Sequence, residues 1–307
     1  MIIDFHTHVY PPEMQALPFW QGRCPMTIEN VLAAQEAAGV DATVISLPFH
    51  ELRDMDRAQQ LAGVRTVNRY FAELQDRHAS IHAIATTVPH GGDPFLRELE
   101  RAVREDGLKG VWILSSLQGS YPDDDEALPF FELAVALDIP VVIHPPSVGF
   151  GEERLNIYRL ASSVGRPMDN ALAISRLIVK GIFERFPTLK LVGSHLGGGI
   201  CEMIGRMDYA YELQDEAFFL GAYAPMMIKH PPSHYLRMMY LESTCYHTPA
   251  ARCAVETVGA DHFVFGTDSP PLLPLKARGV EVIRKLGLTE ADERKVFADN
   301  ARRLLKI

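Results

Sequence analysis

Eight short apolar runs alternate with helical patterns along the chain, and this repetition restricts the possible folds more than any other feature. The runs span residues 2–8, 41–47, 80–88, 108–114, 140–146, 189–198, 236–244 and 262–268. Most of them are too continuously apolar to have a solvated face, which is typical of parallel strands buried on both sides. Repeated strand-then-helix units with eight strands predict a (β/α)8 barrel of the TIM type.

The segments between the runs carry helix signals. In 27–39, Thr27 can cap a helix that Gly39 ends, and 93–107 begins with Asp-Pro and ends with glycine. A doubly wound open sheet is the rival fold, but no G-x-G-x-x-G follows the first run. The 307 residues contain no Ser/Gly linker, repeat or low-complexity block, so residues 1–307 are expected to form one domain.

Composition limits the partners and the compartment. The formal charge of −9, without a lysine- or arginine-rich run, argues against nucleic acid or an anionic membrane as partner. No apolar run reaches the roughly 18 residues of a membrane span, and no basic segment precedes the first strand. Cys24, Cys201, Cys245 and Cys253 form no CxxC spacing, which favours free thiols in a reducing compartment. We therefore expect a cytoplasmic protein.

The first run, "IIDFHTH", contains an aspartate and two histidines. Alternation along a strand predicts that Asp4, His6 and His8 point to one side. Two adjacent imidazoles are awkward to bury unless they share a cation, because neutral imidazole is the commonest metal ligand. Considered alone, the H-x-H pattern leaves a second reading open, in which both histidines are hydrogen-bonded to neighbours.

Other polar residues at the carboxyl ends of the runs favour the metal reading. His144, His195 and Asp268 follow the fifth, sixth and eighth runs, at the face where barrel enzymes carry their chemistry. The predicted metal ligands are His6, His8, His144 and Asp268. Nitrogen and oxygen ligands without thiolate suit one divalent ion, zinc first, with manganese or iron also possible.

Two further residues are expected to support such a site. His195, in "GSHLGGG", could take the proton from a water held by the ion, and its glycines would let the backbone approach closely. Asp4 is expected to orient His6 or His8 rather than to bind the metal.

These motifs together resemble the amidohydrolase superfamily. The resemblance rests on D-x-H-x-H at 4–8, His-Pro at 144–145, "FERFPTLKLVGSHLGGG" at 183–199 and "FGTDSP" at 265–270, and is strongest to the branch related to aminocarboxymuconate semialdehyde decarboxylase. It implies a mononuclear barrel enzyme with the same four ligands and with His195 moving protons. The dinuclear members use a bridging lysine at the end of the fourth strand, where this chain has Leu114 and Ser115.

The resemblance also implies an activity. Members of this branch mostly remove CO2 from small unsaturated or aromatic carboxylic acids without a redox cofactor, and Asp268 and His195 would relay the replacing proton. The alternative is hydrolysis or hydration of a small carboxylic acid or lactone at the same metal. A third alternative is a barrel that binds metal without catalysis. A homodimer is expected, because related decarboxylases often complete the pocket with a neighbouring subunit.

Three arginines are candidates for binding an anionic carboxylic acid. Arg206 matches a Gly-Arg that the decarboxylases carry after the sixth strand, and Arg23 and Arg166 lie in loops expected to face the pocket. The chain departs from the branch at Gln214, where a second arginine is expected, and at Ser269, where an aromatic residue is more usual.

Overall fold

The computed structural model describes residues 1–15, 26–147, 149–216, 224–270 and 276–307. Every ladder between its strands is parallel. The strands are β1 Ile3–His8, β2 Ala42–Ser46, β3 Ile81–Ala83, β4 Ala85–Thr86, β5 Val111–Leu114, β6 Pro140–His144, β7 Lys190–Gly193, β8 Tyr240–Glu242 and β9 Phe263–Val264. Each of the eight apolar runs contains a strand, and run 80–88 contains both β3 and β4.

The strands form two sheets, β1-β2-β3 and β4-β5-β6-β7-β8-β9, which are joined at both ends. Ile84, between β3 and β4, donates its N–H to the carbonyl oxygen of Ile45 at 3.2 Å. At the other end, Thr7 forms a parallel bridge with Ser269, and the His8 N–H donates to the Ser269 oxygen at 2.7 Å. The first strand therefore lies beside the segment after the last strand, which confirms the predicted barrel.

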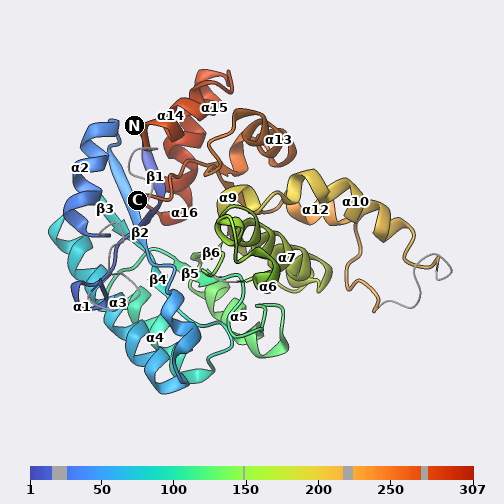
Figure 1. Cartoon of the computed structure of the whole chain (residues 1–307), viewed down its shortest axis with the longest axis horizontal. Coiled ribbons are helices and arrows are strands. Elements are labelled where there is room, and N and C mark those ends of the chain that lie inside the picture. The colour runs from blue at the N-terminus through green and yellow to red at the C-terminus, as the bar shows by residue number, and fades with distance from the viewer. Residues whose placement is uncertain (16–25, 148, 217–223, 271–275) are drawn as a thin grey trace.

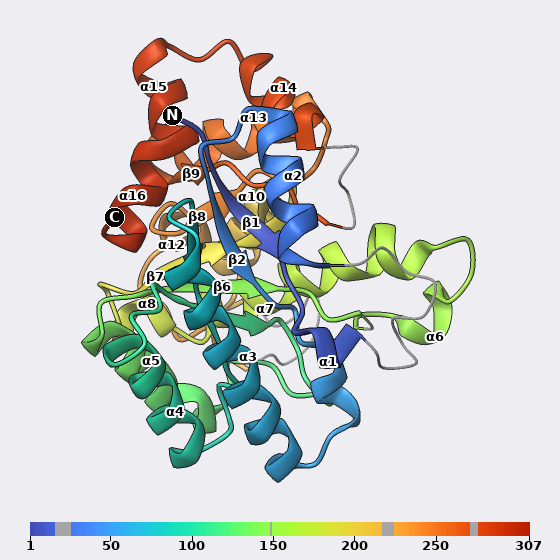
Figure 2. The same cartoon turned by 90° about the vertical axis from the view of Figure 1, so that its left-hand side faces the viewer.

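Helices cover the outside of the strands, and α10 with α12 extends away from them (Figure 1). The segment that contains α6, after β6, protrudes from the body in the second view (Figure 2). The helices are α1 Pro12–Gln15, α2 Ile28–Ala38, α3 Arg57–Arg77, α4 Asp93–Arg104, α5 Leu128–Ala136, α6 Glu152–Leu155, α7 Arg166–Val179, α8 Ile182–Arg185, α9 Ser194–Gly197, α10 Ile200–Glu212, α12 Pro232–Leu236, α13 Thr248–Val258, α14 Lys276–Arg284, α15 Glu290–Arg294 and α16 Asn300–Leu305.

The predicted signals at the ends of α2 are confirmed. The Thr27 hydroxyl accepts a hydrogen bond from the Asn30 N–H at 3.3 Å, as an N-cap does. Gly39 has φ 64°, the left-handed conformation that ends many helices.

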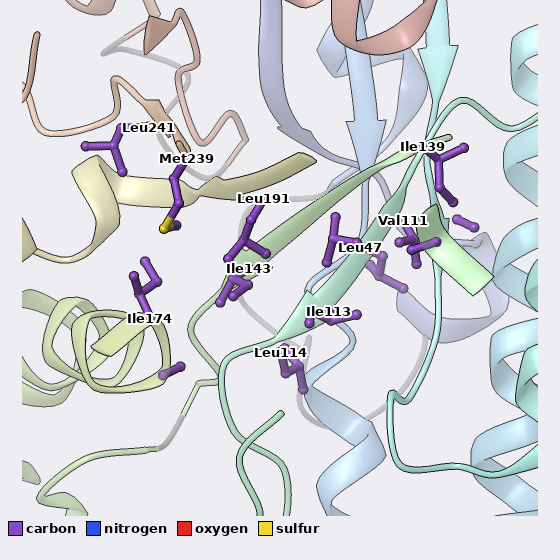
Figure 3. Close-up of a cluster of buried hydrophobic side chains, with 14 of the residues drawn as sticks. Leu47, Val111, Ile113, Leu114, Ile139, Ile143, Ile174, Leu191, Met239 and Leu241 are labelled. Carbon is purple, nitrogen blue, oxygen red and sulfur yellow. The ribbon is translucent and has the colours of Figure 1, made fainter. Parts of the chain in front are cut away.

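Apolar side chains form an outer and an inner layer. The outer layer fills the space between strands and helices, and Figure 3 shows part of it, including Val111, Ile113 and Leu191. The inner layer takes one or two buried residues from six of the nine described strands, including Phe5, Trp112 and Val192, together with residues of the C-terminal helical segment. The inner layer fills the barrel below its carboxyl end, so polar side chains at that end have a rigid floor.

A β-bulge in β1 changes the predicted direction of one polar side chain. The pairing of β1 with β2 shifts between Asp4 and Thr7, and such an extra residue reverses the alternation beyond it. The side chains of Asp4 and Thr7 share a side and are hydrogen-bonded at 3.1 Å, whereas those of His6 and His8 contact each other. The prediction that Asp4 points to the same side as both histidines is therefore wrong.

From the sequence we expect no membrane-spanning segment and free cysteine thiols. None of the helices in the described ranges has the length and apolar character needed to cross a bilayer. Cys201, Cys245 and Cys253 are free thiols, and Cys24 lies outside the described residues.

Candidate metal centre and adjoining cavity

Four side chains from different parts of the sequence meet at the carboxyl end of the barrel. They are His6 of β1, His144 at the end of β6, His195 just after β7 and Asp268 after β9. One nitrogen or carboxylate oxygen from each lies within 4.8 Å of the others. The expectation that these residues gather at one end of the strands is confirmed.

A second imidazole of β1 lies in the same cluster. His8 Nε2 is 3.0 Å from His6 Nε2 and 3.0 Å from Asp268 Oδ1. His6 Nε2 is 3.5 Å from the same carboxylate oxygen. Two ring nitrogens and an acidic oxygen this close can share a proton or bind one cation.

The hydrogen bonds on the far side of each ring determine which nitrogen carries the proton. His6 Nδ1 lies 2.8 Å from Glu242 Oε2, and because an ionised carboxylate only accepts, Nδ1 is the donor. His8 Nδ1 lies 3.2 Å from Ser46 Oγ, which donates its own proton to the Thr7 carbonyl oxygen at 3.0 Å. Ser46 therefore accepts from His8 Nδ1. In the neutral form of each ring, Nε2 therefore has a lone pair that faces the cluster.

The third histidine of the cluster, His144, is buried at the end of β6. Within the described chain neither of its ring nitrogens is hydrogen-bonded, although the residue is only 3% exposed. Its ring centroid lies 5.2 Å from that of His6 and 5.1 Å from that of His8. An unsatisfied buried polar group costs about 1–3 kcal/mol, and a cation bound to one nitrogen would satisfy it. The residues present therefore fit a divalent metal ion.

Burial sets the charge state of these side chains. Burial lowers the pKa of His8 to about 4, and burial with the charges of neighbouring histidines holds the pKa of His144 well below its ordinary value. Burial would raise the pKa of Asp268, but a hydrogen bond from His195 and the charges of His6 and His195 bring it well below its ordinary value. At neutral pH His8 and His144 are thus neutral imidazoles and Asp268 is an ionised carboxylate, the forms that bind metals.

Glu242, at the end of β8, organises the cluster and was missed by the sequence analysis. Its Oε2 accepts from His6 Nδ1 at 2.8 Å and from the His195 N–H at 3.0 Å, while Oε1 accepts from the N–H and hydroxyl of Thr244 at 2.6 and 2.5 Å. A Cβ on Gly266 would lie 2.4 Å from Oε1, so only glycine fits there. The one indication of this role in the sequence is that Glu242 lies near the end of the apolar run 236–244.

Glu242 and His6 also shift each other's pKa. Burial would raise the pKa of Glu242, but the charge and hydrogen bond of His6 lower it overall. Burial would lower the pKa of His6, but the charge and hydrogen bond of Glu242 raise it overall. Such a carboxylate fixes the orientation of a metal-binding histidine and increases its basicity.

His195 lies in a left-handed segment of backbone. His195 and Leu196 have φ of 53° and 54°, a conformation that costs a residue with a side chain roughly 1–2 kcal/mol. The bond from the His195 N–H to Glu242 helps to hold it. Gly198 follows with φ 73°, and a Cβ there would lie 1.9 Å from the Pro167 carbonyl oxygen. Gly198 thus lets this segment approach the backbone of α7 closely.

An aromatic ring lies next to the histidines. The Trp112 ring of β5 has its centroid 5.0 Å from that of His6, 5.4 Å from that of His8 and 5.1 Å from that of His144. Beyond it, β5 ends at Leu114, so the strand supplies no lysine that could bridge two metals.

A cavity of about 560 Å³ adjoins the cluster and is lined by His195 and Asp268. Arg166 is in its wall, as the first residue of α7 rather than in a loop as expected, and its Nε donates to the Ser147 carbonyl oxygen at 3.5 Å. Arg206 is exposed on α10 and does not line this cavity. Arg23 lies outside the described residues. The volume suits a small-molecule ligand.

Asp4 contacts the cluster through the backbone. Its Oδ1 accepts from the His6 N–H at 3.1 Å, and its Oδ2 lies 2.5 Å from Lys276 Nζ and accepts from the Thr267 hydroxyl. Asp4 thus connects β1 with the residue before Asp268. The imidazole of His6 is held by Glu242 instead.

Comparison with known proteins identifies the class. The model of the Amidohydrolase family matches residues 3–307. The 2-amino-3-carboxymuconate-6-semialdehyde decarboxylase of Dictyostelium discoideum is 31% identical over 300 residues, which cover 87% of this chain and 81% of that protein. The chain belongs to the amidohydrolase family, and the resemblance seen in the motifs is confirmed.

Solved structures share the fold. The 5-carboxyvanillate decarboxylase from Sphingomonas paucimobilis superposes with a TM-score of 0.87 at 23% identity, covering 100% of this chain and 99% of that one. A dihydroxybenzoic acid decarboxylase from Polaromonas sp. JS666, with bound manganese and the inhibitor 2-nitroresorcinol, has a TM-score of 0.82 at 22% identity, covering 99% and 96%.

Proposed function

We propose that this chain is a metal-dependent decarboxylase, a carbon–carbon lyase, of a small unsaturated or aromatic carboxylic acid. The observation that carries the proposal is the cluster of histidines and Asp268 beside a cavity that holds an arginine. The 31% identical relative, which is a decarboxylase, supports this reaction over hydrolysis or hydration.

The ligands that we assign are His6, His8, His144 and Asp268. His6 and His8 direct lone pairs into the cluster, His144 needs a partner, and Asp268 Oδ1 lies beside both β1 histidines. Their nitrogen and oxygen donors suit one zinc ion, with manganese or iron as the next choices. The ion would act as a Lewis acid that polarises a substrate oxygen next to the scissile carboxylate.

His195 and Asp268 are the residues that we propose handle the proton. Decarboxylation breaks the bond between the substrate carbon and its carboxylate, leaves the electron pair on that carbon and requires a proton there. His195 lines the cavity with Nε2 at 3.5 Å from Asp268 Oδ2, so it can deliver that proton while Asp268 holds the ring in position. Arg166 would bind the substrate carboxylate from the cavity wall.

Four finer predictions accompany this function. Arg206 is exposed and does not line the cavity, so we propose that its contact with substrate is made in a second copy of the chain. The expected homodimer would give about twice 34.3 kDa in light scattering, and the mass of one chain would contradict it. Arg23 stays a candidate for binding the substrate in the same cavity. The cytoplasmic location rests on the unpaired cysteines.

Product analysis tests the proposal. The purified chain, loaded with zinc or manganese, would be incubated with a panel of dienoic and hydroxybenzoic acids and followed by mass spectrometry. We expect loss of CO2 from one class of acid, and no loss with His195→Asn. Gain of water instead would make the enzyme a hydratase or hydrolase, and no conversion of any acid would refute the proposed substrate class.

A further inference from the structure

We propose that Ser194 and Asn170 are positioning residues that keep the proton of the neutral His195 ring on Nε2. His195 then presents a proton donor to the cavity instead of a lone pair that could bind metal. This inference rests on the proposed function of the same site, and it concerns residues that the motifs did not single out.

The orientation of the Asn170 amide is determined by a backbone group. Its Nδ2 lies 2.9 Å from the Ser194 carbonyl oxygen and 3.0 Å from Ser194 Oγ. A carbonyl oxygen only accepts, so the NH2 end of the amide must face it. Because the same nitrogen bonds the hydroxyl, Asn170 is the donor and Ser194 Oγ the acceptor.

The Ser194 hydroxyl proton then has one destination. Ser194 is fully buried, and a buried hydroxyl is expected to donate its proton to an acceptor. Across the ranges that the structure describes, its contacts are Asn170, which donates, and His195 Nδ1 at 2.9 Å. Ser194 therefore donates to Nδ1, which must be the unprotonated nitrogen of the neutral ring.

The proton of the ring is consequently on Nε2, which lies 3.5 Å from Asp268 Oδ2. Nε2 carries a proton whether the ring is neutral or cationic, because the cationic ring is protonated at both nitrogens. The opposite arrangement occurs at His8, where Ser46 gives its proton to a carbonyl oxygen and accepts from Nδ1. Two buried serines thus orient two histidines in opposite ways.

This difference separates two possible ligand sets. By distance alone, His195 could replace His8 beside His6, His144 and Asp268. A ring nitrogen that carries a proton cannot bind a metal, so the hydrogen bonds exclude His195 and favour His8. A protonated Nε2 can deliver a proton to the substrate carbon. It cannot accept a proton from water, as a base in hydration would have to do.

Nitrogen NMR of the zinc-loaded protein tests the tautomer directly, since ring nitrogens with and without a proton differ widely in 15N chemical shift. Histidine would be labelled, and the His195 signals identified by their absence in His195→Asn. We expect the neutral ring to have a protonated Nε2 and an unprotonated Nδ1. A neutral ring protonated at Nδ1, or a metal-bound Nε2, would overturn the proposal even if the enzyme releases CO2.

The variant Ser194→Ala tests the positioning role. It should fold, because Asn170 keeps the backbone carbonyl as its acceptor. We expect a mixture of His195 tautomers and a fall in kcat of roughly 10-fold or more, with KM and zinc content unchanged. Ser194→Thr, which restores the hydroxyl, should recover the Nε2 tautomer. An unchanged spectrum and kcat in Ser194→Ala would refute the role of Ser194 while leaving the decarboxylase proposal intact.

Two matched variants control the experiment. Ser175→Ala removes a hydroxyl of α7, which donates to the Ala171 carbonyl oxygen at 2.7 Å outside the cluster, and should leave spectrum and turnover unchanged. Ser46→Ala should weaken zinc binding through His8 and leave the His195 tautomer as it is. If wild-type protein releases no CO2 from any acid, the proposed function fails, yet the spectrum still decides the tautomer.

Discussion

Replacing Glu242 by glutamine tests how far one buried carboxylate organises the metal centre. Its oxygens accept hydrogen bonds from His6, His195 and, twice, Thr244. A glutamine has the same shape but a single accepting oxygen. If that oxygen stays with His6 and His195, the NH2 group faces the Thr244 N–H, whose bond at 2.6 Å is lost. We expect the free energy of unfolding to fall by about 1.5–3 kcal/mol, the contribution of one bond to a charged acceptor.

The effect on metal binding should exceed what the loss of stability explains. A neutral amide increases the basicity of His6 less than a carboxylate does, so zinc affinity should fall roughly 10- to 100-fold, or about 1.4–2.7 kcal/mol. Titration against a chromophoric chelator measures the zinc Kd, and urea denaturation of the metal-free protein measures stability. The control is Glu184→Gln, a carboxylate that accepts from the Lys229 N–H at 3.3 Å outside the cluster. An unchanged zinc Kd in Glu242→Gln would refute the reasoning.

Three further predictions concern the ligands, the proton donor and the support beneath them. Metal analysis of the wild-type protein should find about one ion per chain. His6→Ala and Asp268→Ala should each lose metal and turnover together. Metal retained in both variants would mean that the assigned ligands are wrong. His195→Asn should keep the metal and lose turnover roughly 100-fold or more, and loss of metal from the folded variant would contradict its assignment. Lys276→Met should lower the free energy of unfolding by about 3–5 kcal/mol in urea denaturation, because it leaves the buried Asp4 carboxylate without its cation; an unchanged midpoint would count against this.

Periodicity and residue type were enough to predict the barrel and the place of its site. Continuous apolar runs can be buried on both faces only as central parallel strands, and each predicted run contains one. Because the carboxyl ends of all strands in such a barrel lie at one face, His144, His195 and Asp268 had to approach one another. These are consequences of local pattern, which a single sequence displays.

Other features depended on contacts between segments far apart in the chain. The bulge that turns Asp4 towards Lys276 arises from the register of β1 against β2, which alternation within one strand does not reveal. Glu242 looked like any acidic residue at a strand end until the barrel placed it between His6 and the His195 backbone.

The proton positions depend on tertiary structure most of all. The sequence determined which residue types are present: imidazoles, serines, an asparagine and acidic groups near strand ends. Whether Ser46 accepts from one histidine and Ser194 donates to another depends on which carbonyl or amide each hydroxyl meets in three dimensions. A hydroxyl can both donate and accept, so its direction is decided only by partners that folding brings within hydrogen-bond distance.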